Sequence, residues 1–219
     1  MPGSVALALL VALPLTAGAD ALAEPPCVGC RADLALVRAS LGADAWDALL
    51  RGEVVVSEAA DDPETADEGR TVQSAARVER AAREVWAVLL DVEHHRDFLP
   101  NVHRTRVRRV QGNRIFISQH LKVLMMDVRF GVVWTVDPER GDVAFALDET
   151  EENDVAAVRG SWWVVPLGAP SDTLVRYRAA IDTGRPVPAP VQHLLTRRSL
   201  PRVVESLRDE VYRRYPVAH

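Results

Sequence analysis

The sequence predicts an α+β fold in which an antiparallel β-sheet packs against a long C-terminal α-helix. Between residues 103 and 182, apolar stretches alternate with short turn sequences such as QGN, DPERGD and LGAPSD. Short connections of this kind join successive antiparallel strands. After residue 189 the apolar residues instead recur at steps of three and four, which is typical of a helix. With 219 residues and 48% hydrophobic content, the chain can bury a real core.

The N-terminus has the features of a secretory signal. Residues 5–19 form an apolar run that Pro14 interrupts, and the run is too short for a membrane span. Small residues before Ala21 and Ala23 offer cleavage sites. No Lys or Arg precedes the run, so an uncleaved anchor or a mis-assigned start remains the alternative. We expect a signal peptide over residues 1–23, cleavage near Ala23 and a periplasmic or secreted protein.

The two cysteines, Cys27 and Cys30, form the sequence CVGC directly after this signal. No His follows Cys30, which excludes covalent haem attachment, and a four-thiolate zinc site would lack its second pair. A thioredoxin-like motif would lie between a strand and a helix. In an oxidising compartment we expect a local disulfide between them, with redox catalysis as the less favoured reading.

The N-terminal extension, residues 24–70, is expected to contain one helix over residues 31–50 that ends at Gly52. The segment EVVVSEA then reads as a strand. A second strand, TVQSAARVE, follows an acidic loop, and the two strands can pair as a hairpin.

The main domain, residues 71–215, is expected to begin with that second strand and an amphipathic helix, AAREVWAVLLDV. Short helical turns then carry EHHRDFL to Pro100. Six strands follow at about 103–110, 114–123, 125–136, 143–148, 155–166 and 173–182. Pro201 divides a final helix over about 189–214, because proline removes a helical hydrogen bond.

The predicted strands have one apolar face and one face that carries arginine. Phe130, Val132 and Trp134 alternate with polar residues such as Arg129 and Thr135. The same alternation recurs around Trp162 and Tyr177. The apolar stripe of the C-terminal helix is the obvious cover for the apolar face.

The arrangement resembles the START-like helix-grip (SRPBCC) superfamily, in its polyketide cyclase/coenzyme Q-binding branch. The segments that carry the resemblance are AAREVWAVLLDVEHHRDFLPNV, VRGSWWVVPLGAPSDTLVRYRAAIDTG and PVPAPVQHLLTRRSLPRVVESLRDEV. It covers about residues 71–214. It implies a curved antiparallel sheet wrapped around the terminal helix, with a cavity for lipids, sterols, quinones or polyketides between them.

Alternation and resemblance together give the expected ligand-binding residues. They are Phe98, Leu99, Val102, Met126, Val128, Phe130, Val132, Trp134, Trp162, Val175, Tyr177, Ala179, Val187, Val191, Leu194 and Leu195. Phe98 and Leu99 would lie at the cavity mouth, beside a gate formed by residues 185–191. Simple core packing is an equally simple explanation for most of these side chains.

The most conspicuous polar cluster is DVEHHRDFLPNVH, residues 91–103. Asp91, His94 and His95 could share a helical face and suit zinc, but no HExxH spacing or third-ligand motif is present. We expect these polar residues to face water, with Asp91 capping the helix, and no metal site. The acidic turn at 148–154 lacks an EF-hand pattern and is expected to be solvated.

The sequence therefore favours an exported protein that binds a hydrophobic small molecule or lipid, with no cofactor and with transient membrane contact. The net charge of −5 gives no footprint for nucleic acid. One alternative is an aromatase/cyclase with Tyr177 or an inward-facing His120 as its acid/base group. Another is a partner-binding module with a filled core. No catalytic constellation is expected, although the sequence leaves open whether the protein is an enzyme.

Overall fold

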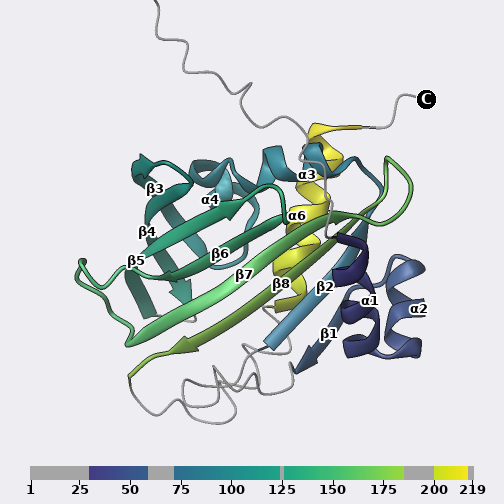
Figure 1. The fold of residues 1–219 in the computed structure, drawn as a ribbon. Coiled ribbons are helices and arrows are strands. Elements are labelled where there is room, and N and C mark those ends of the chain that lie inside the picture. Colours follow the sequence, from purple (N-terminus) through teal and green to yellow (C-terminus); the bar gives the residue numbers. More distant parts are fainter. Residues whose placement is uncertain (1–29, 59–71, 124–125, 185–199, 217–219) are drawn as a thin grey trace, which may run out of the picture.

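The computed structural model describes residues 30–58, 72–123, 126–184 and 200–216 (Figure 1). The helices are α1 (Cys30–Leu41), α2 (Ala43–Leu50), α3 (Ala82–Leu89), the 3₁₀ helix η2 (Val92–His94), α4 (His95–Phe98) and α6 (Leu200–Arg214). The strands are β1 (Val55–Glu58), β2 (Val72–Val78), β3 (Val102–Gln111), β4 (Arg114–Val123), β5 (Met126–Asp137), β6 (Asp142–Leu147), β7 (Ala157–Pro166) and β8 (Thr173–Asp182). None of the described helices is long and apolar enough to cross a membrane.

One antiparallel sheet contains all eight strands in the order β1-β2-β8-β7-β6-β5-β4-β3. Strands β3 to β8 follow one another as a meander, as predicted. Strand β2 pairs with β8, which brings the start of the main domain beside its last strand. The predicted hairpin of β1 and β2 is confirmed by antiparallel pairing between Val55 and Ala75. Strand β3 is left as a free edge.

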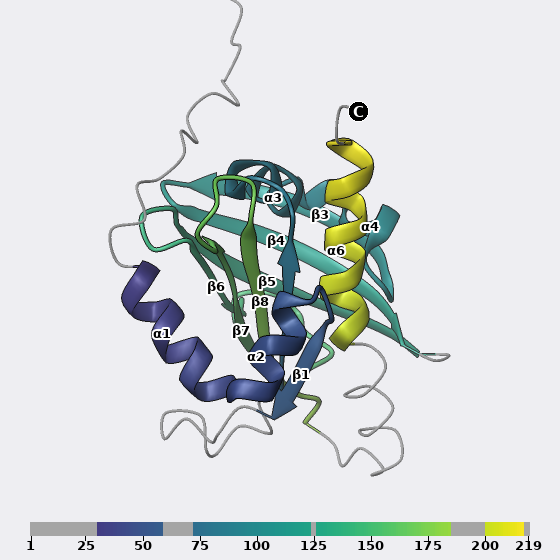
Figure 2. The same cartoon turned by 90° about the vertical axis from the view of Figure 1, so that its right-hand side faces the viewer.

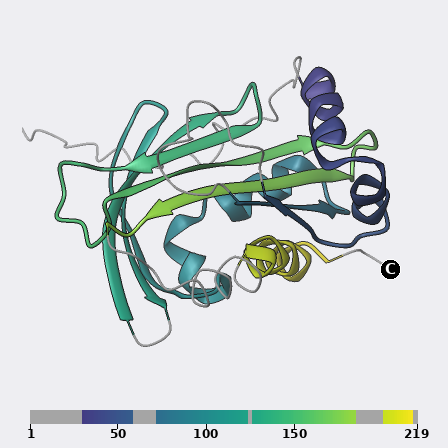
Figure 3. The ribbon, with the colours of Figure 1, turned by 90° about the horizontal axis from the view of Figure 1, so that it is seen from below.

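Helix α6 lies across one face of the curved sheet, which we call the inner face (Figure 3). Val204, Leu207 and Val211 are almost fully buried there, so the predicted apolar stripe is confirmed. The helix packs against β2 and α3. Pro201 is the second residue of the described part of this helix. The predicted helical segment before residue 200, which Pro201 was to divide from the rest, lies outside the described residues.

The opposite, outer face is not simply the solvated arginine face that the sequence suggested. Helices α1 and α2 cover it over β2, β8 and β7 (Figures 2 and 3). Trp46 and Leu49 pack there against Trp163, Val165 and Leu174 in a second core. The N-terminal extension therefore supplies a third layer of the fold.

The helix predicted over residues 31–50 is in fact two helices, α1 and α2. Gly42 separates them with φ 80° and ψ 166°, a conformation that is essentially restricted to glycine. The Gly42 carbonyl accepts a hydrogen bond from the N–H of Trp46 at 3.0 Å, which begins α2. The break lets α1 and α2 follow the sheet surface in two directions (Figure 2).

Candidate functional site

The inner face of the sheet carries a continuous apolar surface from β5 to β8. Phe130, Val132, Trp134 and Val136 of β5 all belong to the core under α6 and α3. They lie on one face because successive strand residues alternate sides. The predicted face of β5 is thus confirmed over most of its length, whereas Met126 at its start is 56% exposed.

Aromatic rings are concentrated in the middle of this surface. Trp134 of β5 pairs across the strands with Phe145 of β6. Phe145 stacks on Tyr177 of β8 with ring centroids 6.0 Å apart, and Tyr177 lies 4.4 Å from Trp162 of β7. We call Trp134, Phe145, Trp162 and Tyr177 the aromatic wall.

Gly160 of β7 makes room for this wall. A Cβ at Gly160 would lie 2.4 Å from the Phe145 ring and 2.0 Å from the backbone oxygen of Arg178. Any larger residue would displace the Phe145 ring or the neighbouring strand. The small residue therefore allows Phe145 to lie over β7 and reach Tyr177.

Tyr177 is the polar member of the aromatic wall. Burial raises the pKa of its hydroxyl to about 12, so the group stays protonated. Its hydroxyl makes no hydrogen bond with any residue in the described part of the chain. The side chain is half-buried and packs against the inner core. It can donate one hydrogen bond to a guest molecule.

His95 corrects the prediction that the polar residues of 91–103 face water. Its side chain is 1% exposed and lies 5.7 Å from the ring of Trp134 and 5.5 Å from that of Phe98. The Nε2 atom lies 2.8 Å from the carbonyl oxygen of Leu89, so Nε2–H is the donor and the neutral Nδ1 is an acceptor. Nδ1 is buried without a hydrogen-bond partner. Burial lowers the pKa of His95 to about 4, so the ring is neutral at pH 7.

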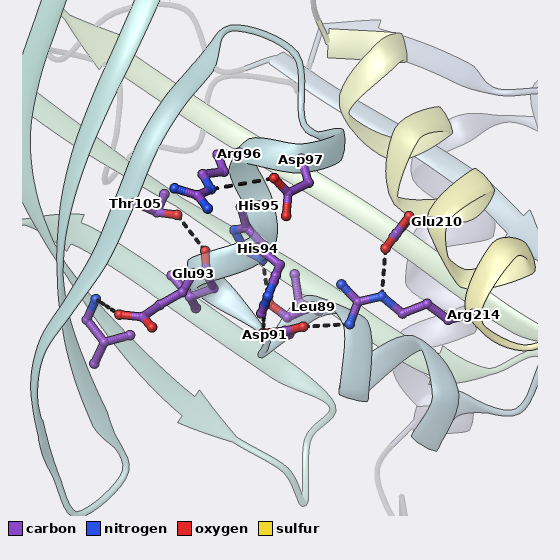
Figure 4. A network of polar contacts seen from close by, with 12 residues as sticks. Leu89, Asp91, Glu93, His94, His95, Arg96, Asp97, Thr105, Glu210 and Arg214 are labelled. Carbon is purple, nitrogen blue, oxygen red and sulfur yellow. Dashed lines mark hydrogen bonds and ion pairs between the residues drawn. The ribbon is translucent and has the colours of Figure 1, made fainter.

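Asp91 and His94 of this segment belong to a polar clamp that joins the end of α6 to η2 (Figure 4). Arg214 binds Asp91 and Glu210, each at 2.6 Å, and Asp91 also binds Nδ1 of His94 at 2.6 Å. Asp91 therefore pairs with side chains, and it does not cap the helix as predicted. Hydrogen bonds from Arg213 and Arg214 lower the pKa of Glu210 to about 2. Burial would raise the pKa of Asp91, but hydrogen bonds from His94 and Arg214 outweigh it.

Two other polar features lie away from the inner face. His120 points outward from β4 and binds Asp127 at 2.5 Å, so it is excluded as an inward acid/base group. Most of the turn at 148–154 is exposed, as predicted, but Asp148 is 4% exposed and binds Arg108. No group of three metal-ligating side chains occurs within the described ranges.

The predicted ligand-binding residues fall into four groups in the structure. Phe130, Val132, Trp134, Trp162, Val175 and Ala179 are buried in the inner core. Phe98, Leu99, Val102, Val128 and Tyr177 are half-buried, and Met126 is exposed. Val187, Val191, Leu194 and Leu195, with the gate at 185–191, lie outside the described residues. So do Cys27 and the side chain of Cys30, and with them the predicted disulfide.

Sequence reasoning missed His95 and Phe145. Phe145 was visible in principle, because Val143, Phe145 and Leu147 alternate with alanines along β6. His95 left no such signal, since it stands among four polar neighbours in EHHRD.

Comparisons with known proteins agree with this architecture. A family model described as polyketide cyclase/dehydrase and lipid transport matches residues 78–208, which is more than half of the chain. No curated protein sequence matches the chain.

Solved structures with the same fold have low sequence identity. The Zhui aromatase/cyclase from Streptomyces sp. R1128 is 19% identical, with a TM-score of 0.57 over 66% of this chain and 94% of that one. A STAR-related lipid transfer protein from Xanthomonas axonopodis is 15% identical, with a TM-score of 0.56 over 72% and 92%. Human STARD10 is 16% identical, with a TM-score of 0.61 over 76% and 71%.

These likenesses confirm the START-like helix-grip fold that the sequence motifs predicted. The match to the family model rests on the helix, meander and terminal helix that build the inner face. The chain therefore belongs to the polyketide cyclase/dehydrase and lipid transport family.

Proposed function

We propose that this protein is exported and binds a hydrophobic small molecule, such as a lipid, sterol or quinone, between the inner face of its sheet and α6. It would carry this molecule without transforming it. The observation that carries the proposal is the aromatic wall, in which Tyr177 is half-buried and its hydroxyl bonds to none of the described residues.

The chemistry of the inner face suits such a guest. Apolar ligand surface removed from water contributes roughly 25 cal/mol per Å² before the costs of association. Rings from Trp134, Phe145 and Trp162 offer that surface. Binding pockets are usually apolar with few polar groups that fix orientation. Tyr177 would supply this group by donating to a ligand oxygen.

The relatives support the same class of function. The matching family is described by lipid transport as well as cyclase activity, and the Xanthomonas axonopodis neighbour is named a lipid transfer protein. A half-buried Phe98 and Leu99 beside the inner core are consistent with an entrance for such a molecule.

Mass spectrometry of organic extracts from the purified protein tests the proposal directly. We expect a bound hydrophobic molecule, and displacement of it by a short-chain quinone or a fluorescent fatty acid. Tyr177→Phe should weaken binding of oxygen-bearing ligands by about tenfold, because one hydrogen bond in a buried site is lost. Tyr212→Phe is the control, since that hydroxyl accepts from the N–H of Glu79 outside the wall. A protein that copurifies with nothing and binds none of these probes would instead have a filled core.

An aromatase/cyclase activity is the second candidate, because the Zhui neighbour is named as one and the Nδ1 atom of His95 is buried beside Trp134 without a partner among the described residues. The acid/base pair would be Tyr177 and His95 instead of His120. Export argues against it, since carrier-bound polyketides are made in the cytoplasm. Turnover of a polyketide-like chain that disappears in Tyr177→Phe, with binding retained, would establish it.

Export is tested separately by fractionation and N-terminal sequencing. We expect a mature protein that starts near Glu24 in the periplasm or the medium. A cytoplasmic protein that retains Met1 would contradict export and leave ligand binding to be judged by the extracts alone.

A further inference from the structure

A surface cleft lies where the free edge of β3 meets η2 and α4. It measures about 330 Å³ and is lined by Glu93, His94, Arg96, Arg104, Thr105 and Arg106 (Figure 4 shows four of these). The cleft is separate from the inner core, because its walls are polar side chains around the sheet edge. Three of its six lining residues carry a permanent positive charge.

The arginines of this cleft have fewer hydrogen-bond and ion-pair partners than most other arginines in the described part of the fold. Arg104 and Arg106 form no side-chain ion pair or hydrogen bond with any residue that the structure describes. Arg96 has only a 3.5 Å contact with its exposed neighbour Asp97. By contrast, Arg108 on the same strand binds Asp148 and Glu151. The cleft is therefore lined by three arginines whose hydrogen-bonding capacity is largely unused.

The remaining lining groups are already engaged and hold the walls in place. Thr105 donates its hydroxyl proton to the carbonyl oxygen of Val92 at 2.6 Å. The Glu93 carboxylate accepts from the N–H of Val107 at 3.3 Å, on the free edge of β3 (Figure 4). His94 is bound through Nδ1 to Asp91. The lining thus contains one carboxylate and three arginines, so its net charge is positive.

We propose that this cleft binds a phosphate group, with Arg104, Arg106 and Arg96 as its ligands. The planar guanidinium fork matches the geometry of phosphate oxygens and donates two parallel hydrogen bonds. The cleft is large enough for a phosphate together with the group that it esterifies. The phosphate can belong to a phospholipid headgroup or to a soluble phosphate ester, since both present the same oxygens.

The competing explanation is that these arginines only protect the edge strand. Charged residues on an edge keep other chains from pairing with it. That role requires charge along β3, and it does not require a cleft that Arg96 of α4 also lines. It predicts that removing other exposed arginines weakens anion binding equally, so the two explanations differ in a measurable result.

The test is calorimetric titration of the purified protein with inorganic phosphate and glycerol phosphate, and sedimentation with vesicles. The vesicles are phosphatidylcholine alone or phosphatidylcholine with phosphatidylglycerol. We expect binding in at least one arm, and about tenfold weaker binding in R104A/R106A, since charge-assisted hydrogen bonds are lost. R104K/R106K keeps the charge without the fork and should fall between the two.

R83A/R202A is the matched control, because it removes two exposed arginines on α3 and α6 outside the cleft. Binding to soluble phosphates assigns a phosphate ester, and binding only to phosphatidylglycerol vesicles assigns a headgroup. Absence of binding in every arm would overturn the proposal. So would equal losses in R104A/R106A and the control, which indicate attraction by overall charge. Neither result depends on whether the inner core holds a ligand.

Discussion

Trp162 and Trp163 are adjacent in β7 and equally buried, at 3% and 5% exposure, yet they belong to two different cores. Trp162 faces α6 and contacts Tyr177, whereas Trp163 faces α1 and α2. The indole N–H of Trp163 donates to the carbonyl oxygen of Arg140 at 3.1 Å, and Arg176 lies over its ring. The indole N–H of Trp163 thus has a hydrogen-bond partner in the outer core.

The inner core leaves polar atoms without partners. The Nδ1 atom of His95 is buried and unbonded, and the Tyr177 hydroxyl bonds to no residue within the described ranges. Buried polar groups are hydrogen-bonded in the great majority of proteins, so such exceptions need an explanation. We therefore expect the outer core to serve the stability of the fold, and the inner core to serve the proposed binding of a ligand.

Replacing each tryptophan by alanine should separate these roles. Trp163→Ala is expected to lower the free energy of unfolding by about 3–5 kcal/mol, the usual cost of removing a large buried aromatic. Trp162→Ala should also destabilise the protein, but only this variant should weaken binding of a fluorescent fatty acid. Urea unfolding and probe titration measure the two effects. Equal loss of binding in both variants would contradict the division between the cores.

The pH dependence of stability should report the inner core through His95. Its pKa of about 4 in the fold lies below the ordinary 6.5, so the unfolded chain binds the proton more readily. Stability is therefore full above pH 6.5 and falls as the pH drops toward 4. At 1.36 kcal/mol per pKa unit, the loss across this window is about 3 kcal/mol.

Urea unfolding between pH 7 and pH 4 measures this slope, with His95→Gln as the comparison. Most of the loss should disappear in that variant, whatever its stability at pH 7. Glu210 adds little here, because its pKa of about 2 places its own loss below pH 4.5. An unchanged slope in His95→Gln would mean that His95 is not the titrating group.

The strands were predictable because turn residues and alternation set them locally. Strands β4 and β8 match the predicted 114–123 and 173–182 from end to end. The second core also left a trace, since Trp163, Val165 and Leu174 are apolar on the face that was assigned to arginine. A strand that is apolar on both sides indicates burial on both faces.

The position of His95 could not be predicted in the same way. The chain changes from the 3₁₀ helix η2 to the α-helix α4 between His94 and His95. The two helix types advance by different angles per residue, so the local spacing does not say which histidine turns inward. The tertiary contacts with Trp134 and Leu89 decide it.

The cover of the outer core depends on Gly42. Gly42→Ala should lower the free energy of unfolding by about 2 kcal/mol, because its φ and ψ are strained for any residue with a side chain. No atom lies within 4 Å of the position that a Cβ would take, so the cost is conformational and not a clash. Urea unfolding measures it, and fatty-acid binding should stay unchanged. Loss of binding would show that α1 and α2 influence the inner core.

The cover of the inner core depends instead on the polar clamp at the end of α6, and here we expect the smallest effect. Arg214→Met should cost about 1 kcal/mol, since its pairs with Asp91 and Glu210 are partly exposed and screened by water. Arg213→Met is the neighbouring control. That side chain is 70% exposed and contacts only Glu210, so its removal should be nearly neutral. Because Asp91 directly precedes η2, loss of the clamp should also speed amide hydrogen exchange in residues 92–98. If exchange there stays unchanged in Arg214→Met, apolar packing alone holds α4 against the sheet. The helices on both faces of the sheet would then be held by apolar packing, without a contribution from the polar clamp.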